Sequence, residues 1–360
     1  MMVMEEMESQ RKTFILERGE YDKPTTEVHR AAPGDILEFS EDYPKNRLGL
    51  SQWLFNRDNP LTARVAVNRY WQMIFGRGLV STTNDFGNQG SIPTHPELLD
   101  WLAVEFRDSG WDTRALIRKM VMSNTYTQSS KTSLELAEFD PDNELLARAP
   151  SYRLQAEFIR NNALASSGLI NRKVGGESVK PYQPEGLWIA GNFSQALAKY
   201  VQDHDKKQYR RTMYTFIKRT APPPYMTIFD MPTRDICMVS RESTNTPLQA
   251  LSLLNDPQFV EAAKALAVRM KKEGGEQINA QLEIGFQMAV SRKPNKKELQ
   301  ILNDLYKQEF SNFQKSKENA LAYLAVGDYK VPNEYQLSEM ATLTLVANTL
   351  LNMDEMYTKR

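Results

Sequence analysis

Helix-start signals recur along the chain from residue 46 onward, and they constrain the fold more than any other feature. At three of them a capping residue is followed by proline: Asn59-Pro60, Thr246-Pro247 and Asp256-Pro257. Proline suits the first turn of a helix because its missing N–H would have no partner there. Apolar residues at helical spacing follow these signals. We therefore predict a mainly α fold, a multi-helix domain with few short strands.

Two further helix starts are indicated by polar residues without proline at the same place. Thr94-x-x-Glu97 has the spacing of a capping box, and Asp112 precedes another apolar helical run. The last helix is predicted near residues 336–352.

Residues 1–45 do not look like the start of a domain. A short strand-like run at 13–16 is followed by a polar stretch with several prolines. A lone strand can neither bury its faces nor pair its edges. We therefore interpret residues 1–45 as a linker and the strand remnant of an upstream region, and residues 46–360 as the helical C-terminal module of a longer protein.

Residues 168–245 interrupt the helical pattern with an irregular middle segment rich in glycine, proline and aromatic residues. Such a long segment inside a compact domain is usually functional or disordered. Disordered segments are poor in aromatic residues, so we predict that this one is ordered and packed on the helices. It divides the module into sub-units at 46–167, 168–245 and 246–360.

Charge and composition exclude several classes of protein. The chain carries 45 Lys+Arg and 45 Asp+Glu, whereas a general nucleic-acid binder needs a basic excess, so no nucleic-acid partner is expected. Cys237 is the only cysteine and the three histidines lie far apart in sequence, so no metal site is expected. No apolar run reaches the roughly 18 residues of a membrane span.

A first candidate site lies in NRYWQMIFGRGLV and the NDFG that follows, over residues 68–87. Its glycines allow a tight backbone path after a helix, beside which polar side chains can converge. The ligand-binding candidates are Arg69, Trp71 and Arg77, and Asp85 is a candidate catalytic carboxylate. The simpler interpretation is a helix stop whose Asp or Arg holds the loop backbone.

A second candidate site is the His95-Pro96-Glu97 sequence at a predicted helix start. Loop residues at a helix N-terminus often line sites, so His95 and Glu97 are candidate catalytic groups. The alternative is a histidine beside the cap, with Glu97 completing the capping box.

The most informative candidate is the segment 209–245, in which arginines alternate with aromatic residues. Arginine forks bind carboxylate, sulfate or phosphate in bidentate geometry, and aromatic faces stack on sugars. The predicted ligand-binding residues are Arg210, Arg211, Tyr214, Arg219, Arg234, Arg241 and Asn245. Asp230 and Glu242 are further candidate carboxylates for glycoside hydrolysis, although their separation in space does not follow from the sequence. An internal salt-bridge network that pins the segment onto the helices is an equal alternative.

Several segments together resemble one known family, among them NRLGLSQWLFNRDNP, THPELLDWLAVEF, YRRTMYTFIKRTAPPP and RESTNTPLQALSLLNDPQFVEAA. From about residue 46 to its end the chain is similar to domain-of-unknown-function family 1553, the C-terminal module of planctomycete-type cytochrome C domain proteins. The resemblance implies a periplasmic or cell-surface bacterial protein with upstream domains, one of them carrying a c-type haem. The chain itself has no CxxCH motif, so no cofactor is expected in it. The resemblance transfers no reaction and no catalytic residue.

Three hypotheses of function remain open at this point. The first is an extracytoplasmic module that recognises, or acts on, an anionic (sulfated or uronic) polysaccharide. The second is a non-catalytic helical assembly module that docks to its upstream domains or to a partner protein. It predicts that the arginines pair internally and that the region near residues 1–45 exposes apolar side chains. The third is an electron-transfer surface for an upstream haem, which would need aromatic residues at that interface.

Overall fold

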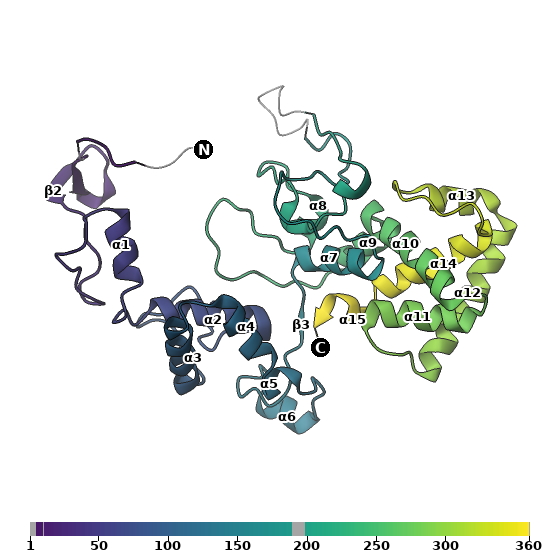
Figure 1. The fold of residues 1–360 in the computed structure, drawn as a ribbon, viewed down its shortest axis with the longest axis horizontal. Helices are drawn as coiled ribbons and strands as arrows, with labels where there is room; N and C mark the ends of the chain where they lie inside the picture. Colours follow the sequence, from purple (N-terminus) through teal and green to yellow (C-terminus); the bar gives the residue numbers. More distant parts are fainter. Residues whose placement is uncertain (1–4, 10, 189–198, 360) are drawn as a thin grey trace. The chain divides into compact units, whose positions relative to one another are not determined.

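The computed structural model describes residues 5–9, 11–188 and 199–359, and the chain divides into two compact units. Unit 1 spans residues 1–149 and unit 2 spans residues 150–360. Helices dominate both units, and the named strands of the described residues form only two short pairs (Figure 1). The predicted mainly α class is confirmed.

Unit 1 begins with a β-hairpin and continues with helices. The strands are β1 (Thr13–Leu16) and β2 (Pro24–Val28), joined through a 3-10 turn, Glu17–Gly19. The helices are α1 (Arg47–Leu54), α2 (Thr62–Phe75), α3 (Pro96–Asp108), α4 (Thr113–Val121), α5 (Asn124–Thr127) and α6 (Leu134–Phe139).

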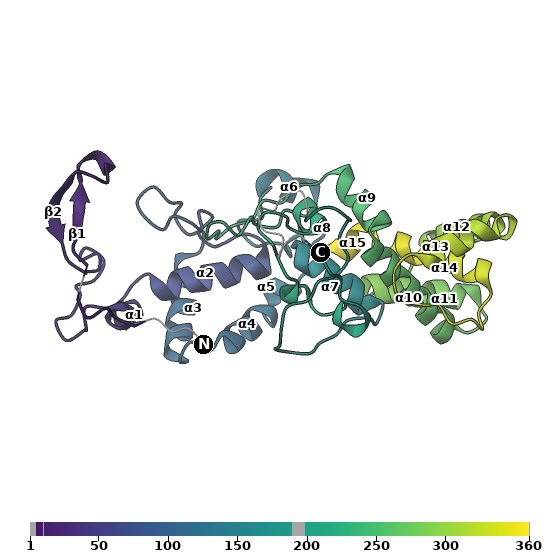
Figure 2. The same ribbon diagram turned by 90° about the horizontal axis from the view of Figure 1, so that it is seen from above.

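The strand-like run at the start of the chain does not stand alone. It pairs antiparallel with β2, with Thr13 opposite Val28 and Leu16 opposite Pro24. Figure 2 shows the two strands side by side, and among the described residues they form a two-stranded sheet. Strand β2 was not predicted, because a strand exposed on both faces has no alternating apolar pattern.

Of three helix starts predicted in unit 1, the one at Asp112 is confirmed, since its side chain accepts from the N–H of Arg114 and Ala115 and caps α4. The start predicted at Asn59-Pro60 lies too early, because α2 begins at Thr62. Asn59 Oδ1 accepts hydrogen bonds from the N–H of Leu61 (3.0 Å) and Thr62 (3.2 Å) just before that helix. The predicted Thr94 capping box does not form. The Thr94 hydroxyl instead donates to the carbonyl of Leu79 at 3.4 Å, and α3 begins one residue later than predicted, at Pro96.

The core of unit 1 is built between α2, α3 and α4. Apolar residues at helical spacing on these three helices meet, together with two residues of the loop after α2. The buried residues are Val67, Trp71, Phe75, Leu79, Val80, Leu99, Leu102, Phe106, Leu116 and Met120.

Unit 2 holds the longer helices and a second pair of short strands. The strands are β3 (Tyr152–Arg153) and β4 (Thr358–Lys359). The helices are α7 (Ala156–Ser166), α8 (Pro224–Ile228), α9 (Pro247–Asn255), α10 (Pro257–Gly274), α11 (Ile278–Val290), α12 (Lys296–Lys315), α13 (Lys317–Ala325), α14 (Leu337–Leu351) and α15 (Asp354–Tyr357).

Helices α10 and α14 form the centre of unit 2, with α11, α12 and α7 packed around them (Figure 1). Both central helices are buried over most of their length. The predicted caps are present, since Asp256 Oδ1 accepts from the N–H of Gln258 at 2.9 Å and Thr246 forms a capping box with Gln249. Strands β3 and β4 pair antiparallel, which joins the first and last elements of the unit.

The segment predicted to be irregular lies in unit 2. Its described parts contain 3-10 turns at 205–207 and 212–214, the short helix α8, and isolated bridges such as Asn171 with Arg210 and Val179 with Thr215. Residues 189–198 of this segment lie outside the described residues. The bridges connect its two halves, so the segment is held by its own backbone as well as by the helices.

We expect Leu266→Ala to lower the free energy of unfolding of unit 2 by about 2–5 kcal/mol, because it leaves a cavity in the core. Leu266 lies on α10 and is 0 % exposed. Urea unfolding followed by circular dichroism measures the loss. The matched control is Leu321→Ala on α13, where the side chain is 58 % exposed and a change within about 0.5 kcal/mol is expected. Equal losses in the two variants would contradict the assigned core.

Candidate functional site

The residues predicted to form a site are divided between the two units. Those of residues 68–97 belong to unit 1, and those of residues 209–245 belong to unit 2.

In unit 1 the predicted catalytic groups have few partners beyond their own loops. Asp85 accepts a hydrogen bond from the N–H of Gly87 at 2.8 Å, which closes a tight turn. His95 is the residue preceding α3, and its Nδ1 lies 3.0 Å from the Thr94 hydroxyl. Glu97 is exposed in the first turn of α3. No carboxylate hydrogen-bonds to the His95 ring in the described part of the chain, and the proposed acid–base roles stay predictions.

The predicted ligand-binding residues of unit 1 lie in different surroundings. Trp71 is buried and stacks on Phe75, with 4.0 Å between ring centroids, so it packs in the core rather than on a surface. Arg77 pairs with Asp142 at 3.2 Å and with Glu144. Arg69 is exposed on α2. The three do not form one binding surface.

In unit 2 the most buried arginine of the predicted groove is bound to backbone. Arg210 is 5 % exposed, and its guanidinium donates to the carbonyls of Glu177 (2.7 Å), Gly175 (2.6 Å) and Lys173 (3.3 Å). It also lies over the ring of Tyr214, 3.8 Å from the centroid. The Tyr214 hydroxyl accepts from the N–H of Gly175 at 2.8 Å, and this hydrogen bond, with the nearby arginines, lowers the pKa of Tyr214. Arg210 and Tyr214 thus hold the 173–177 loop.

The remaining arginines of the segment differ in how firmly they are paired. Arg241 forms a bidentate pair with Glu157 on α7, at 2.7 and 3.2 Å. Arg219 lies 3.6 Å from Asp235, but both side chains are more than 60 % exposed, so the pair contributes little. Arg234 is exposed and makes no ion pair among the described residues. Arg211 is half-buried, 5.8 Å from the ring of Tyr214.

Asp230, predicted as a catalytic carboxylate, instead fastens the two ends of the 231–243 loop together. It adopts a positive φ of 60° and accepts hydrogen bonds from the N–H (2.9 Å) and hydroxyl (3.0 Å) of Thr244. Arg153 of β3 pairs with the same carboxylate and donates to the carbonyl of Thr244 at 3.2 Å. Glu242 and Asn245 are exposed.

A polar cluster that the sequence did not single out lies around α10. Glu261 is 1 % exposed and accepts hydrogen bonds from the hydroxyls of Tyr182 (3.2 Å) and Tyr209 (3.0 Å), and from the N–H of Tyr329. Burial and the neighbouring Glu261 carboxylate raise the pKa of both tyrosines, so each remains a hydrogen-bond donor at neutral pH.

Lys264 lies one turn further along the same helix and is fully buried. Its ammonium donates to the carbonyls of Tyr329 (2.8 Å) and Leu324 (3.2 Å). Burial lowers the pKa of Lys264 to about 8, although the charges of Glu261 and Asp328 oppose that shift. The side chain has no exposed surface, so its role here is to hold the chain around residues 324–329.

A histidine–aspartate pair lies at the surface of this cluster. His204 Nδ1 and Asp328 Oδ2 are 2.7 Å apart, and Gln208 donates to the same oxygen at 3.0 Å. The hydrogen bond to Asp328 raises the pKa of His204. The N–H of Asp328 donates to the Tyr182 hydroxyl at 2.7 Å, which connects the pair to Glu261. A carboxylate-oriented imidazole can hold a proton at this surface.

One sequence signal would have pointed to this cluster. Glu261 and Lys264 lie three residues apart within FVEAAKALA, so two charged residues occupy one face of an otherwise apolar run. A charged pair inside a run that must be buried predicts polar partners from other segments. The identity of those partners depends on the tertiary fold.

The described ranges hold neither a metal-ligand cluster nor a membrane-spanning helix. Among residues 5–9, 11–188 and 199–359, no three His, Cys, Asp or Glu side chains gather closely enough to hold a metal ion. Within the same ranges no helix has the length and apolar character needed to cross a membrane.

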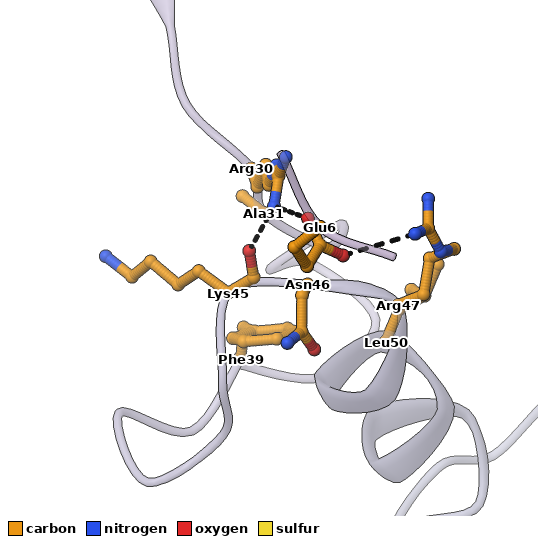
Figure 3. Close-up of a pocket in the computed structure, with 8 residues that line it drawn as sticks. All are labelled: Glu6, Arg30, Ala31, Phe39, Lys45, Asn46, Arg47 and Leu50. Carbon is orange, nitrogen blue, oxygen red and sulfur yellow. Dashed lines mark hydrogen bonds and ion pairs between the residues drawn. The ribbon is translucent and has the colours of Figure 1, made fainter. Parts of the chain in front are cut away.

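A pocket of about 310 Å³ lies in unit 1, between the residues after β2 and the start of α1. Its lining residues are Glu6, Arg30, Ala31, Phe39, Lys45, Asn46, Arg47 and Leu50. The Glu6 carboxylate bridges two arginines, at 3.0 Å from Arg30 and 3.3 Å from Arg47 (Figure 3). Arg30 also donates to the carbonyl of Lys45 at 3.0 Å, whereas the Lys45 ammonium points away from Glu6.

The comparison with known families decides the family of the chain. A family model described as "Protein of unknown function (DUF1553)" matches residues 46–306, which is most of the chain. The chain belongs to the DUF1553 family. The matched range begins at the cap of α1 and ends within α12, so it covers the arginine segment and the α10 residues of the polar cluster, while Asp328 and Tyr329 lie beyond it. Most of the pocket-forming loop precedes it.

No curated protein and no solved structure shows significant similarity to this DUF1553 chain.

We expect the stability of unit 2 of the DUF1553 chain to rise between pH 8 and 10, by up to about 2 kcal/mol, and Lys264→Met to abolish most of that rise. The folded pKa of Lys264 (about 8) lies below its unfolded value of 10.5. Between these values the unfolded state binds more protons, so raising the pH favours the folded state. Urea unfolding at pH 7.5, 8.5 and 9.5 measures the slope.

The matched control for this pH series is Lys272→Met, on the exposed side of the same helix. It should keep the wild-type slope. The assignment fails if Lys264→Met retains the full rise, or if Lys272→Met loses as much of it.

Proposed function

We propose that this chain is a non-catalytic helical assembly module, and that its β1–β2 hairpin docks onto the open sheet edge of another folded domain. The observation that carries this proposal is the exposure of the hairpin. Every residue of β2 and all but one residue of β1 are exposed, and none is buried.

An isolated two-stranded hairpin is only marginally stable in water, because it has no third strand and no covered face. Its apolar side chains are left in solvent, with Ile15 56 % and Tyr21 90 % exposed. Neither β1 nor β2 pairs with a third strand among the described residues, so each presents an open edge of backbone N–H and C=O groups. Strand addition to another sheet would satisfy these groups and cover the apolar side chains.

The pairing of the arginines in unit 2 also favours assembly over catalysis. Arg210 and Arg241 are committed to backbone carbonyls and to Glu157, and Asp230 is committed to Arg153 and Thr244. These interactions hold the irregular segment in place, which supports a structural role for the three residues.

For the partner, we propose an upstream domain of the same polypeptide. The resemblance to planctomycete-type cytochrome C domain proteins supports this choice, since relatives carry such domains before this module. On the same ground we propose an extracytoplasmic location and a c-type haem on the upstream region.

The docking proposal predicts that the hairpin is protected from hydrogen exchange only when its partner domain is present. In the 360-residue chain, backbone amides of residues 12–28 should exchange nearly as fast as in an unstructured peptide. In the full-length polypeptide their protection should rise by roughly tenfold or more, equivalent to about 1.4 kcal/mol. Hydrogen exchange followed by mass spectrometry measures both.

The variant Ile15→Lys places a charge on the docking face and should return the hairpin to fast exchange in the full-length polypeptide. The matched control is Leu134→Lys on α6, where the leucine is 86 % exposed and lies outside the hairpin. Docking through the hairpin is refuted if the amides exchange at one rate in both polypeptides, or if both lysine variants have the same effect.

A second candidate function is recognition of an anionic polysaccharide. Two of the predicted ligand-binding residues support it. Arg219 and Arg234 are exposed, and the ion pair of Arg219 with Asp235 is open to solvent. Guanidinium groups that are exposed to solvent in this way can bind sulfate or carboxylate groups.

If this candidate is correct, the double variant Arg219→Gln/Arg234→Gln should weaken binding of chondroitin sulfate or alginate by about tenfold or more, and binding should fall with added salt. Isothermal titration calorimetry measures the affinity. The control is Arg118→Gln/Arg172→Gln, which removes the same charge from two other exposed positions. Absence of binding by the wild type, or equal loss in both double variants, would remove the glycan hypothesis.

A further inference from the structure

The pocket at the foot of the hairpin gathers positive charge around an apolar floor. Arg30 follows β2, Arg47 is the first residue of α1, and the two guanidinium groups hold one carboxylate between them (Figure 3). Phe39 and Leu50 are the large apolar residues of its lining. Cations above apolar carbon suit an acidic side chain, which has an aliphatic stem and a charged end.

The rest of the protein holds Arg30 more firmly than it holds Arg47. Arg30 is oriented by its hydrogen bond to the carbonyl of Lys45, so its guanidinium is already directed at the carboxylate position. Arg47 has only the carboxylate as its partner among the described residues, and its side chain is 57 % exposed. The guanidinium groups of Arg30 and Arg47 therefore form a preformed carboxylate-binding site, the carboxylate clamp. Arg30 is fixed in it, whereas Arg47 can move.

The present occupant comes from an acidic stretch of the chain itself. Residues 5–9 read Glu-Glu-Met-Glu-Ser, and the carboxylate of Glu6 enters the clamp. The Glu6 side chain is 42 % exposed, and exposed ion pairs of this kind are weak, at about 0–1 kcal/mol each. An occupant held so weakly can be displaced by another carboxylate.

The size of the pocket favours a peptide over a longer glycan. With Glu6 in place as one wall, the space is about 310 Å³, at the lower end of the range of ligand pockets. That volume accommodates one or two side chains rather than a run of sugar rings.

We infer that this pocket is a binding site for an acidic peptide segment, in which Arg30 and Arg47 hold a glutamate or aspartate side chain, and that Glu6 is its intramolecular occupant. Binding of a partner segment displaces Glu6. The site is distinct from the hairpin surface, because it recognises charge rather than open strand edges.

The test uses the 360-residue chain and a fluorescein-labelled acidic pentapeptide with the sequence of residues 5–9, EEMES. Fluorescence anisotropy measures its affinity for wild type, Glu6→Gln, Glu8→Gln and Glu6→Gln/Arg47→Gln. Glu8→Gln is the matched control, since it removes the same charge from the same stretch but does not touch the clamp in the described structure. A QQMQS peptide controls for charge-independent binding, and circular dichroism checks that each variant folds.

We expect Glu6→Gln to bind the EEMES peptide about three- to tenfold more tightly than wild type, because the weak internal competitor is gone. Glu8→Gln should bind as wild type does, and adding Arg47→Gln should reduce the binding to that of the QQMQS peptide. Raising the salt concentration should weaken the binding of EEMES.

Three results would overturn the inference. The first is an equal gain in Glu6→Gln and Glu8→Gln, which would show an effect of net charge alone. The second is binding that survives Arg47→Gln. The third is tighter binding of a chondroitin sulfate disaccharide than of EEMES by the Glu6→Gln chain, which would assign the pocket to an anionic sugar. None of these results bears on the hairpin, whose test depends on Ile15.

Discussion

The structure of unit 2 depends on one constraint, that its central helix is buried on nearly every side and yet carries charged residues. Glu261 and Lys264 of α10 are 1 % and 0 % exposed. A buried charge without partners would destabilise the fold by several kcal/mol. The carboxylate is satisfied by two tyrosine hydroxyls and an N–H group, and the ammonium by two carbonyls. Because these partners lie in the irregular segment and before α14, the two charges fasten both regions to the core.

The requirement that buried polar groups have hydrogen-bond partners also explains why an arginine-rich segment is not automatically a binding groove. An irregular segment exposes backbone carbonyls that no helix or sheet satisfies, and guanidinium groups supply several donors in a fixed plane. Arg210 uses them on three carbonyls of one loop, and Arg153 reinforces the clasp made by Asp230. Of the arginines predicted to bind a ligand in that segment, Arg219 and Arg234 are exposed.

In unit 1, by contrast, groups are exposed that folded proteins normally cover. The hairpin has open edges, and the pocket beside it holds its carboxylate by exposed ion pairs. Both features lie in or next to the first 50 residues. They favour this end of the chain as the place where the module meets other protein, whereas the polar groups of unit 2 largely serve the fold.

The contrast between prediction and structure follows from the distance over which each feature is determined. By itself the sequence determined the mainly α class and most helix starts, because caps such as Asp112 and Asp256 and the apolar periodicity act within a few residues. It missed β2, whose exposed residues carry no pattern, and it could not assign the arginines. Only the tertiary structure decided which polar groups are structural, since the partners of Glu261 lie between 52 and 79 residues away along the chain. Whether a charged side chain is free to bind a ligand depends on those distant partners.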